Sequence, residues 1–214
     1  MAVSFPNGSQ LAVASTISAS KNMTALTNAL QAVATLEASH GIVGNDIIIL
    51  TSGWGNIDGS VRKVASVATN DATISGLDTT NTTRFPTGSG IGSVRKISAW
   101  TSLTQVTDLA TSGGEQQFNQ YQFLDSDTQR QLPTVRSPMN LTFSLGDDPS
   151  LPWYSVMRAL SDSRVATPLR VTLPNGGIIY YNGIITMAET PTMTVNEIMK
   201  LNVTVSLSAT PTRV

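Results

Sequence analysis

The sequence predicts an all-β-dominated protein, sandwich-like or barrel-like, with one short helix. Apolar and polar residues alternate over several short stretches, which is the period of a strand with one buried face. Gly, Asn and Asp turns separate these stretches at short intervals, as in sandwiches and barrels. Only one segment has the apolar spacing of a helix. We therefore expect a single β domain over residues 1–214.

The clearest strand lies near the end of the chain, where Met199 to Ala209 alternates strictly between apolar and polar side chains. Asn140 to Leu145 alternates in the same way. Two extended runs, Arg170 to Leu173 and Ile178 to Met187, flank an Asn-Gly turn and therefore predict a hairpin. Further strands are expected at Ile47 to Leu50, Val61 to Ala68 and Ile74 to Leu77.

The helix is expected at about residues 149–162, packed outside the β structure. Asp147 and Asp148 are residues that cap helices, and Pro149 is tolerated in a first turn. Apolar residues then recur at i, i+3, i+4 and i+7, at Trp153, Val156, Met157 and Leu160.

Two stretches leave alternatives open. Thr24 to Ala38 fits a helix by its alanines and a strand by its threonines, and we favour a strand. Gly59-Ser60-Val61-Arg62-Lys63-Val64 returns as Gly92-Ser93-Val94-Arg95-Lys96-Ile97. Two strands that begin alike explain this echo more simply than an internal duplication.

An N-terminal arm, residues 1–10, and two long loops, residues 78–92 and 107–138, are expected to extend from the domain. The loops are rich in Thr, Asn, Gly and Gln and show little hydrophobic periodicity. Long connections in a compact β domain usually have a role outside their own core.

The composition favours a protein whose surfaces are covered by copies of itself. Charged residues make up 13% of the chain, against about 25% on average, and the net charge is -1. Ser, Thr, Asn and Gln take their place, and uncharged polar groups cost less to desolvate than ions. A globular domain that merely carries little charge is the alternative.

Chemistry-bearing motifs are scarce, so we expect no catalytic, metal or cofactor site and no enzyme activity. The chain has one histidine, His40, in a turn-like context without a paired nucleophile. Asp125-Ser126-Asp127 and Asp147-Asp148 lack the spaced ligands of a calcium loop. Gly88 to Gly92 resembles a phosphate-binding loop but has neither the Lys-Ser/Thr ending nor the strand-to-helix context.

Binding partners are also restricted. The basic pairs Arg62-Lys63 and Arg95-Lys96 lie in a nearly neutral chain, which disfavours tight binding to phosphates. The tryptophans and tyrosines leave open a carbohydrate-binding surface, although their spacing equally fits core packing. The chain has no cysteine, and we see no signal peptide and no apolar run long enough to insert in a membrane.

Short turn and strand motifs follow one another in order along almost the whole chain. They are Gly44 to Ile47, Thr51 to Trp54, Leu77 to Thr80, Arg84 to Pro86, Gly88 to Gly90, Ser112 to Phe118, Leu132 to Thr134, Gly146 to Pro149 and Leu173 to Gly176. Each motif is weak alone, but in this order they resemble the tail tube proteins of long, non-contractile-tailed bacteriophages.

The resemblance implies a structural virion protein that builds stacked, usually hexameric rings around a β-barrel channel. DNA passes through this channel without specific binding. The implied partners are further copies of the chain, the tape measure protein, and the tail terminator and tail tip proteins. Assembly takes place in the host cytoplasm, and the product is part of the virion tail. A capsid or baseplate accessory protein and a carbohydrate-binding adhesin module are the alternatives.

Two segments are expected to carry these contacts. Strands that line the channel or close the ring are placed in Val94 to Val106 and Glu115 to Leu124, and their polar residues include Thr104, Gln105, Gln117 and Gln120. Contacts between rings are placed in the arm before Leu11 and in the loop Asp78 to Gly92, which includes Arg84, Phe85 and Pro86. Deleting Thr80 to Gly90 is expected to leave a folded protein that no longer stacks.

Overall fold

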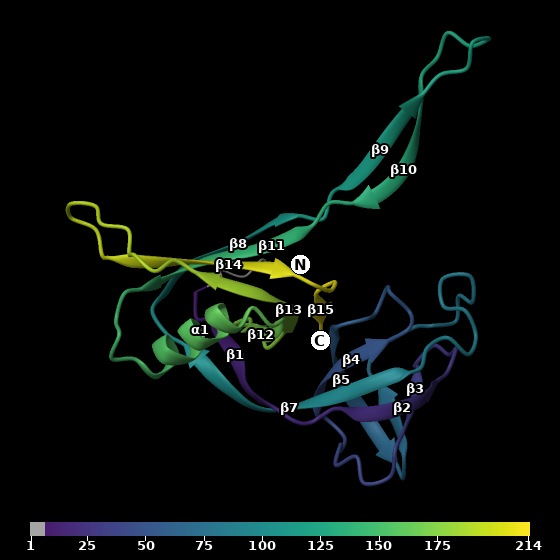
Figure 1. Cartoon of the computed structure of the whole chain (residues 1–214), viewed down its shortest axis with the longest axis horizontal. Helices are drawn as coiled ribbons and strands as arrows, with labels where there is room; N and C mark the ends of the chain where they lie inside the picture. Colours follow the sequence, from purple (N-terminus) through teal and green to yellow (C-terminus); the bar gives the residue numbers. More distant parts are fainter. Residues whose placement is uncertain (1–6) are drawn as a thin grey trace.

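The structure, a computed structural model, describes residues 7–214, and these form fifteen strands and one helix. A closed barrel, a curled sheet with the helix, and a narrow arm can be distinguished in Figure 1. The all-β class with a barrel and a single short helix is confirmed. Residues 1–6 of the predicted N-terminal arm lie outside the described residues, and Gln10 already belongs to the first strand.

The elements have the following bounds: β1 Gln10–Ile17, β2 Lys21–Leu26, β3 Val33–Leu36, β4 Ile47–Ser52, β5 Ser60–Ala68, β6 Asp71–Ile74, β7 Gly92–Leu103, β8 Val106–Gly113, β9 Gln116–Tyr121, β10 Arg130–Arg136, β11 Met139–Gly146, α1 Pro152–Ser163, β12 Thr167–Thr172, β13 Ile178–Met187, β14 Lys200–Leu207 and β15 Thr212–Arg213.

The barrel consists of β2, β3, β6, β5, β4 and β7. It closes because β2 pairs with β3 on one side and with the start of β7 on the other. Apolar side chains that alternate along these strands fill the interior, among them Leu36, Ile48, Leu50, Ile74 and Val94. A closed barrel has no free strand edge, so this part of the chain is complete without a neighbour.

The strand preference for Thr24 to Ala38 is confirmed, with an interruption between β2 and β3. The strand predicted at Ile74 to Leu77 was misplaced by about three residues, because β6 ends at Ile74. Gly76 adopts a left-handed φ of 64°, which turns the chain out of the sheet just after β6.

The sequence echo corresponds to two strands that begin alike, β5 and β7, which lie on either side of β4. Val61 pairs with Ile49 and faces the junction between the barrel and the curled sheet. Val94, its counterpart in the echo, pairs with Leu50 and faces the barrel interior. Corresponding residues of the two sequence repeats therefore lie on opposite faces of the barrel wall, and the repeat is not a structural duplication.

The curled sheet has the order β7-β1-β12-β13-β14-β11-β8, so β7 belongs to both the barrel and the sheet. Its core comes from the apolar side of each strand and from α1. The predicted terminal strand and the predicted hairpin are confirmed as β14 and β12–β13. The hairpin turn contains Gly176 at a φ of 84°, as an Asn-Gly turn requires.

The helix lies outside the closed barrel and packs on β13, where it buries Trp153 and Met157. The predicted capping was wrong, since α1 starts at Pro152 and not at Pro149. Asp148 instead accepts hydrogen bonds from the backbone N–H and the hydroxyl of Ser150, which forms a turn one step before the helix. These bonds hold the pKa of the Asp148 carboxyl below its usual value.

The prediction of a loop over residues 107–138 was also wrong. β8 and β11 pair and continue into the separate ribbon of β9 and β10, so that residues 106–146 form one long hairpin (Figure 1). We call the part beyond the sheet, residues 115–137, the arm. Both of its faces are exposed, so the sequence carries no apolar-polar alternation that would reveal a strand.

Met157→Ala should lower the free energy of unfolding by about 2–5 kcal/mol, because it opens a cavity between α1 and the sheet. Ser155→Ala, on the exposed side of the same helix, should change it by less than about 0.5 kcal/mol. Urea unfolding of both variants gives the comparison. Equal effects would show that the helix does not complete this core.

Candidate assembly surfaces

The arm is a ribbon of two strands that exposes large apolar side chains. A two-stranded ribbon without a third strand or a packed face is marginally stable in water. Large apolar side chains are at least half exposed on the arm, namely Phe118, Phe123, Leu124, Leu132 and Val135. Such a surface marks an interaction site.

The two faces of the arm differ in composition. Phe118 pairs with Pro133, and the next pair on that face is Gln120 with Gln131. The other face carries the pairs Asn119 with Leu132 and Tyr121 with Arg130. Tyr121 also meets Phe123 edge to face, with 5.3 Å between ring centroids. We call this second side the Leu132 face.

Gly113 and Gly114 join the arm to the sheet, and both adopt a φ of about 80°. A Cβ on Gly113 would overlap the carbonyl oxygen of Pro138. The paired strands therefore change direction at a position that only glycine can occupy without strain.

The outer side of β8, β11 and β14 is polar. The cross-strand pairs Asn140 with Ser206, Thr142 with Thr204 and Ser144 with Asn202 form its centre. The residues that alternate with them along β11 and β14 point into the core of the curled sheet. Asp108 and Lys200 are the only charged residues in these three strands. We call this surface the polar face.

The sheet also has an open edge. β8 is the last strand in the order and pairs only with β11 among the described residues, so its far side has unpaired backbone groups. Uncovered edges of this length pair readily with another chain. A groove beside this edge is lined by Leu11, Leu109, Val171 and Leu173 among others.

A second apolar surface lies at the opposite end of the sheet from the arm. The connection between β13 and β14, residues 188–199, exposes Met193, Val195, Ile198 and Met199. Beside it is an open groove of about 520 Å³, which we call the end groove. Its lining consists of Gln105, Val106, Thr107, Gly146, Asp147, Asp148, Ile198 and Met199.

The residues predicted to line the channel do not lie together. Thr104 and Gln105 form the turn between β7 and β8, where the hydroxyl of Thr104 accepts a hydrogen bond from the indole of Trp153 at 3.2 Å. Gln117 and Gln120 lie on β9, in the arm. All four side chains are exposed, and their role in a channel stays a prediction.

The loop after β6 covers one end of the barrel. Phe85 is 5% exposed and meets Trp54 edge to face at 5.2 Å, within the barrel core. The amide of Asn28 donates to the carbonyl oxygens of Thr79 and Phe85, and the indole of Trp54 donates to that of Pro86. Phe85 thus belongs to its own barrel.

Arg84 and Pro86 are exposed on either side of Phe85, and the Arg84 guanidinium lies 5.6 Å from the centre of the Phe85 ring. Their contact with a neighbouring ring stays a prediction. The deletion of Thr80 to Gly90 is not a clean test of it, because the deletion also removes part of the barrel core.

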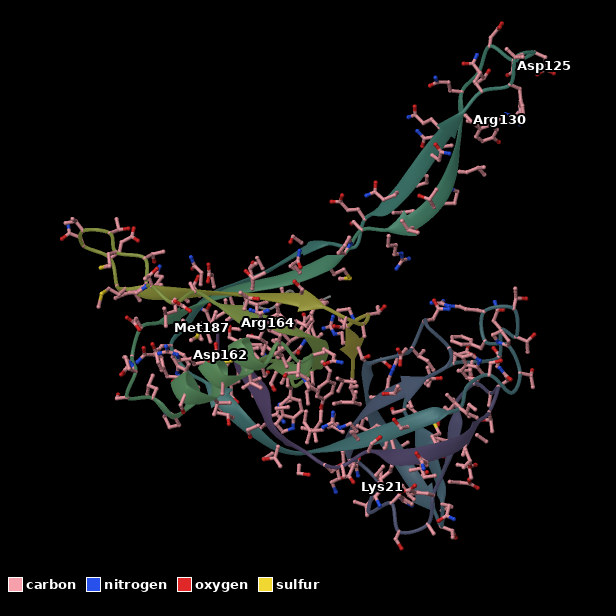
Figure 2. The ribbon with its side chains drawn as sticks, in the orientation of Figure 1. Lys21, Asp125, Arg130, Asp162, Arg164 and Met187 are labelled. Atoms are coloured by element: carbon pink, nitrogen blue, oxygen red, sulfur yellow. The ribbon has the colours of Figure 1, made fainter. Side chains whose placement is uncertain are left out.

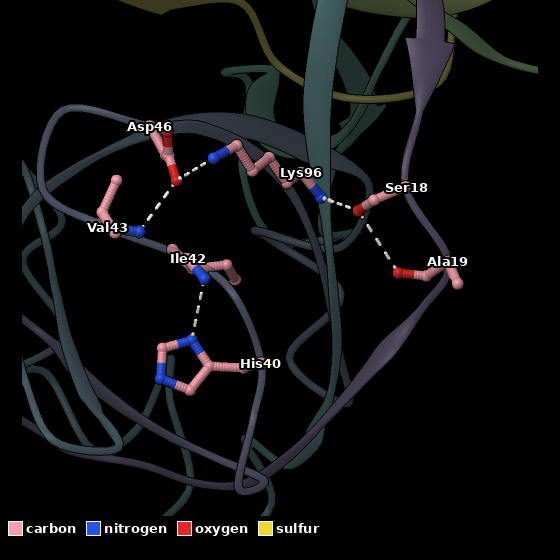
Figure 3. A network of polar contacts seen from close by, with 7 residues as sticks. All are labelled: Ser18, Ala19, His40, Ile42, Val43, Asp46 and Lys96. Atoms are coloured by element: carbon pink, nitrogen blue, oxygen red, sulfur yellow. Dashed lines mark hydrogen bonds and ion pairs between the residues drawn. The ribbon is translucent and has the colours of Figure 1, made fainter.

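His40 has a structural environment (Figure 3). Its Nδ1 accepts a hydrogen bond from the backbone N–H of Ile42, so Nε2 carries the proton and donates to the carbonyl of Thr69. In the same region Lys96 forms an ion pair with Asp46 at 2.8 Å, and Asp46 also accepts from the N–H of Val43. These contacts fasten the segment before β4 to the barrel.

Other kinds of site receive little support in residues 7–214. No three side chains of His, Cys, Asp or Glu gather there as a metal site would require. No helix in that range has the length and apolarity to cross a membrane. Trp54 and Trp153 are buried in separate cores, so they are not available for a sugar-binding surface. Trp100 is partly buried, with the Arg170 guanidinium 4.9 Å from its ring centre.

The fold thus combines a closed barrel, a sheet with an open edge at β8, and an arm that is exposed on both faces. The sequence profile of the phage tail tube proteins matches residues 52–214. The chain therefore belongs to the phage tail tube protein family and is a structural component of the virion tail.

Comparison with curated proteins gave no match. Among solved structures, the chain is similar to one in the 6-fold symmetrised baseplate of the anti-feeding prophage, with a TM-score of 0.41 and 9% identity over 55% of this chain and 85% of that one. It is also similar to one in the tube-terminating cap of that particle, with a TM-score of 0.36 and 18% identity over 49% and 78%. Both overlaps are partial, so family membership rests on the sequence profile.

Sequence reasoning placed a strand at Glu115 to Leu124, which overlaps β9, but it missed β10, the ribbon that β9 and β10 form, and the end groove. The available signal for the arm was its composition, since β9 and β10 contain Gln, Phe, Tyr, Leu and Val but no acidic residue. The groove joins residues 105–107, 146–148 and 198–199, which only the fold brings together.

Phe85→Ala should lower the free energy of unfolding by about 3–5 kcal/mol, because the ring fills the end of the barrel beside Trp54. Thr87→Ala, in the exposed part of the same loop, should stay within about 0.5 kcal/mol of the parent chain. Denaturant unfolding measures both values. A negligible change in the free energy of unfolding of Phe85→Ala would contradict its role in the barrel core, and Phe85 would again be a candidate for contact between rings.

Proposed function

We propose that the chain assembles into stacked rings of six copies around a channel through which DNA is delivered to the host. The observation that carries this proposal is the incomplete surface of the single chain, with an open β8 edge and an arm exposed on both faces. Family membership supports a tube, and six copies to a ring follow the resemblance noted in the sequence. Edges and apolar surfaces of this kind are hazards in a monomer and contacts in an assembly.

The polar face is the proposed wall of the channel. Its centre consists of Ser, Thr and Asn side chains, and the charges of Asp108 and Lys200 balance. DNA is retained by concentrated positive charge, since each phosphate contact adds affinity. A neutral hydroxyl and amide wall lets DNA slide past without holding it.

The remaining roles follow from this assembly. The chain works without catalysis, and its partners are further copies of itself, the tape measure protein that occupies the channel before DNA, and the terminator and tip proteins at the two ends. Assembly takes place in the host cytoplasm before the virion is complete. No specific DNA sequence is recognised.

Negative-stain electron microscopy of the purified chain tests the proposal. Hollow tubes of stacked rings are expected, with six subunits in end-on views. A monomer, or a closed assembly of fixed size, would contradict the tube and favour an adhesin module or an accessory protein of the capsid or baseplate.

Single-cysteine labelling tests the channel wall, since the chain contains no other cysteine. In assembled tubes, Thr204→Cys should react with a small maleimide but only slowly with one carrying a bulky polymer, because the channel excludes the polymer. Ser155→Cys, exposed on α1, is the control and should react with both reagents. Fast polymer labelling at both positions would place the polar face on the outside.

A further inference from the structure

Two exposed apolar surfaces lie at opposite ends of one sheet. The arm continues β8 and β11 beyond one end, and the end groove lies at the other, where β8 begins and β11 ends. Figure 2 shows this separation, with Asp125 and Arg130 at the far end of the arm and Met187 close to the opposite end. The arm therefore cannot reach the groove of its own chain.

The Leu132 face combines apolar and basic groups. Leu132 is more than half exposed, and the Tyr121–Phe123 pair extends the apolar area toward the tip. Arg130 lies opposite Tyr121 on the same face. The charged residues of β9 and β10 are Arg130 and Arg136, whereas Asp125 and Asp127 lie at the tip of the arm and Glu115 lies at its base. The positive charge is therefore confined to the paired strands.

The end groove has the complementary chemistry. Val106, Ile198 and Met199 supply its apolar part, and Ile198 is 62% exposed. Asp147 and Asp148 line it, and no basic side chain does. Ser150 donates two hydrogen bonds to the Asp148 carboxylate, which lowers its pKa and favours the charged form.

We propose that the arm of one copy lies in the end groove of a second copy. Leu132 and the Tyr121–Phe123 pair then cover Ile198 and Met199, and Arg130 lies beside Asp147. This inference rests on the proposed tube and identifies the contact that joins successive rings.

The contact is heterologous, because two different surfaces of the same chain meet. A heterologous contact that does not close into a ring repeats without limit. Since the arm and the groove lie at opposite ends of the same strands, each repeat displaces a copy along the strand direction. The arm also gains the packing that a lone two-stranded ribbon lacks.

Disulfide trapping tests the pairing, because the chain has no other cysteine. Tubes of the Leu132→Cys/Ile198→Cys variant should form a ladder of covalent oligomers on oxidation. Gln131→Cys/Ile198→Cys is the matched control, since Gln131 lies one residue away on the opposite face of the arm, and it should give little cross-linking. Tubes that form normally but cross-link equally in both variants, or in neither, would overturn the arm contact and leave the tube itself standing.

Charge reversal is the second test and does not depend on cysteine reactivity. Arg130→Glu alone and Asp147→Lys alone should each reduce tube formation in sedimentation and electron microscopy, whereas the double variant should restore it. The side chain of Asp147 makes no hydrogen bond among the described residues, so its replacement leaves the turn at Asp148 intact. Single variants that form tubes like the parent chain would refute the pairing. Failure of the parent chain to form tubes would instead refute the proposed function.

Discussion

One strand, β7, holds the molecule together because it belongs to two sheets. Its first half closes the barrel against β2 and β4, and its second half pairs with β1 in the curled sheet. The corner between the two is sealed by a small apolar cluster in which Ile49, Val61, Ile97 and Tyr180 are buried. Barrel and sheet are therefore joined by a shared strand and a packed corner, without a linker between them.

The two parts that β7 joins differ in how completely their strand edges are paired. The barrel satisfies its own backbone and fills its own interior, with Phe85 and Trp54 covering one end. The curled sheet ends in an uncovered strand, and its longest hairpin extends into solvent. A protein of this form gains stability when copies join, because the groups left unsatisfied in one chain are those that another chain can satisfy.

The sequence reveals most clearly the strands that face a core. β14 and β11 were predicted from alternation, since every second residue from Leu141 to Leu145 and from Leu201 to Val205 is buried. β9 and β10 have no buried face, so their order of residues is not constrained by the period of a strand. The helix was predicted from the spacing of Trp153 and Met157. It begins at Pro152 and not at Pro149, because Asp148 accepts a hydrogen bond from Ser150 and so does not cap a helix at that point. The end groove could not be predicted, because it joins three segments that are distant in sequence.

The low charge of the chain can be explained by the positions of its charged side chains. β11 and β14 put apolar side chains on one side and Ser, Thr and Asn on the other, and β8 adds Asp108, Ala110 and Ser112 to the outer face. Lysine or arginine in place of Thr142 or Thr204 would add phosphate contacts along the proposed channel, and affinity rises with each such contact. A channel wall that lets DNA pass therefore favours short uncharged side chains. The charged groups proposed to join one copy to the next lie beyond the two ends of this wall. Asp147 and Arg130 lie at those ends, where one copy meets the next in the proposed stack.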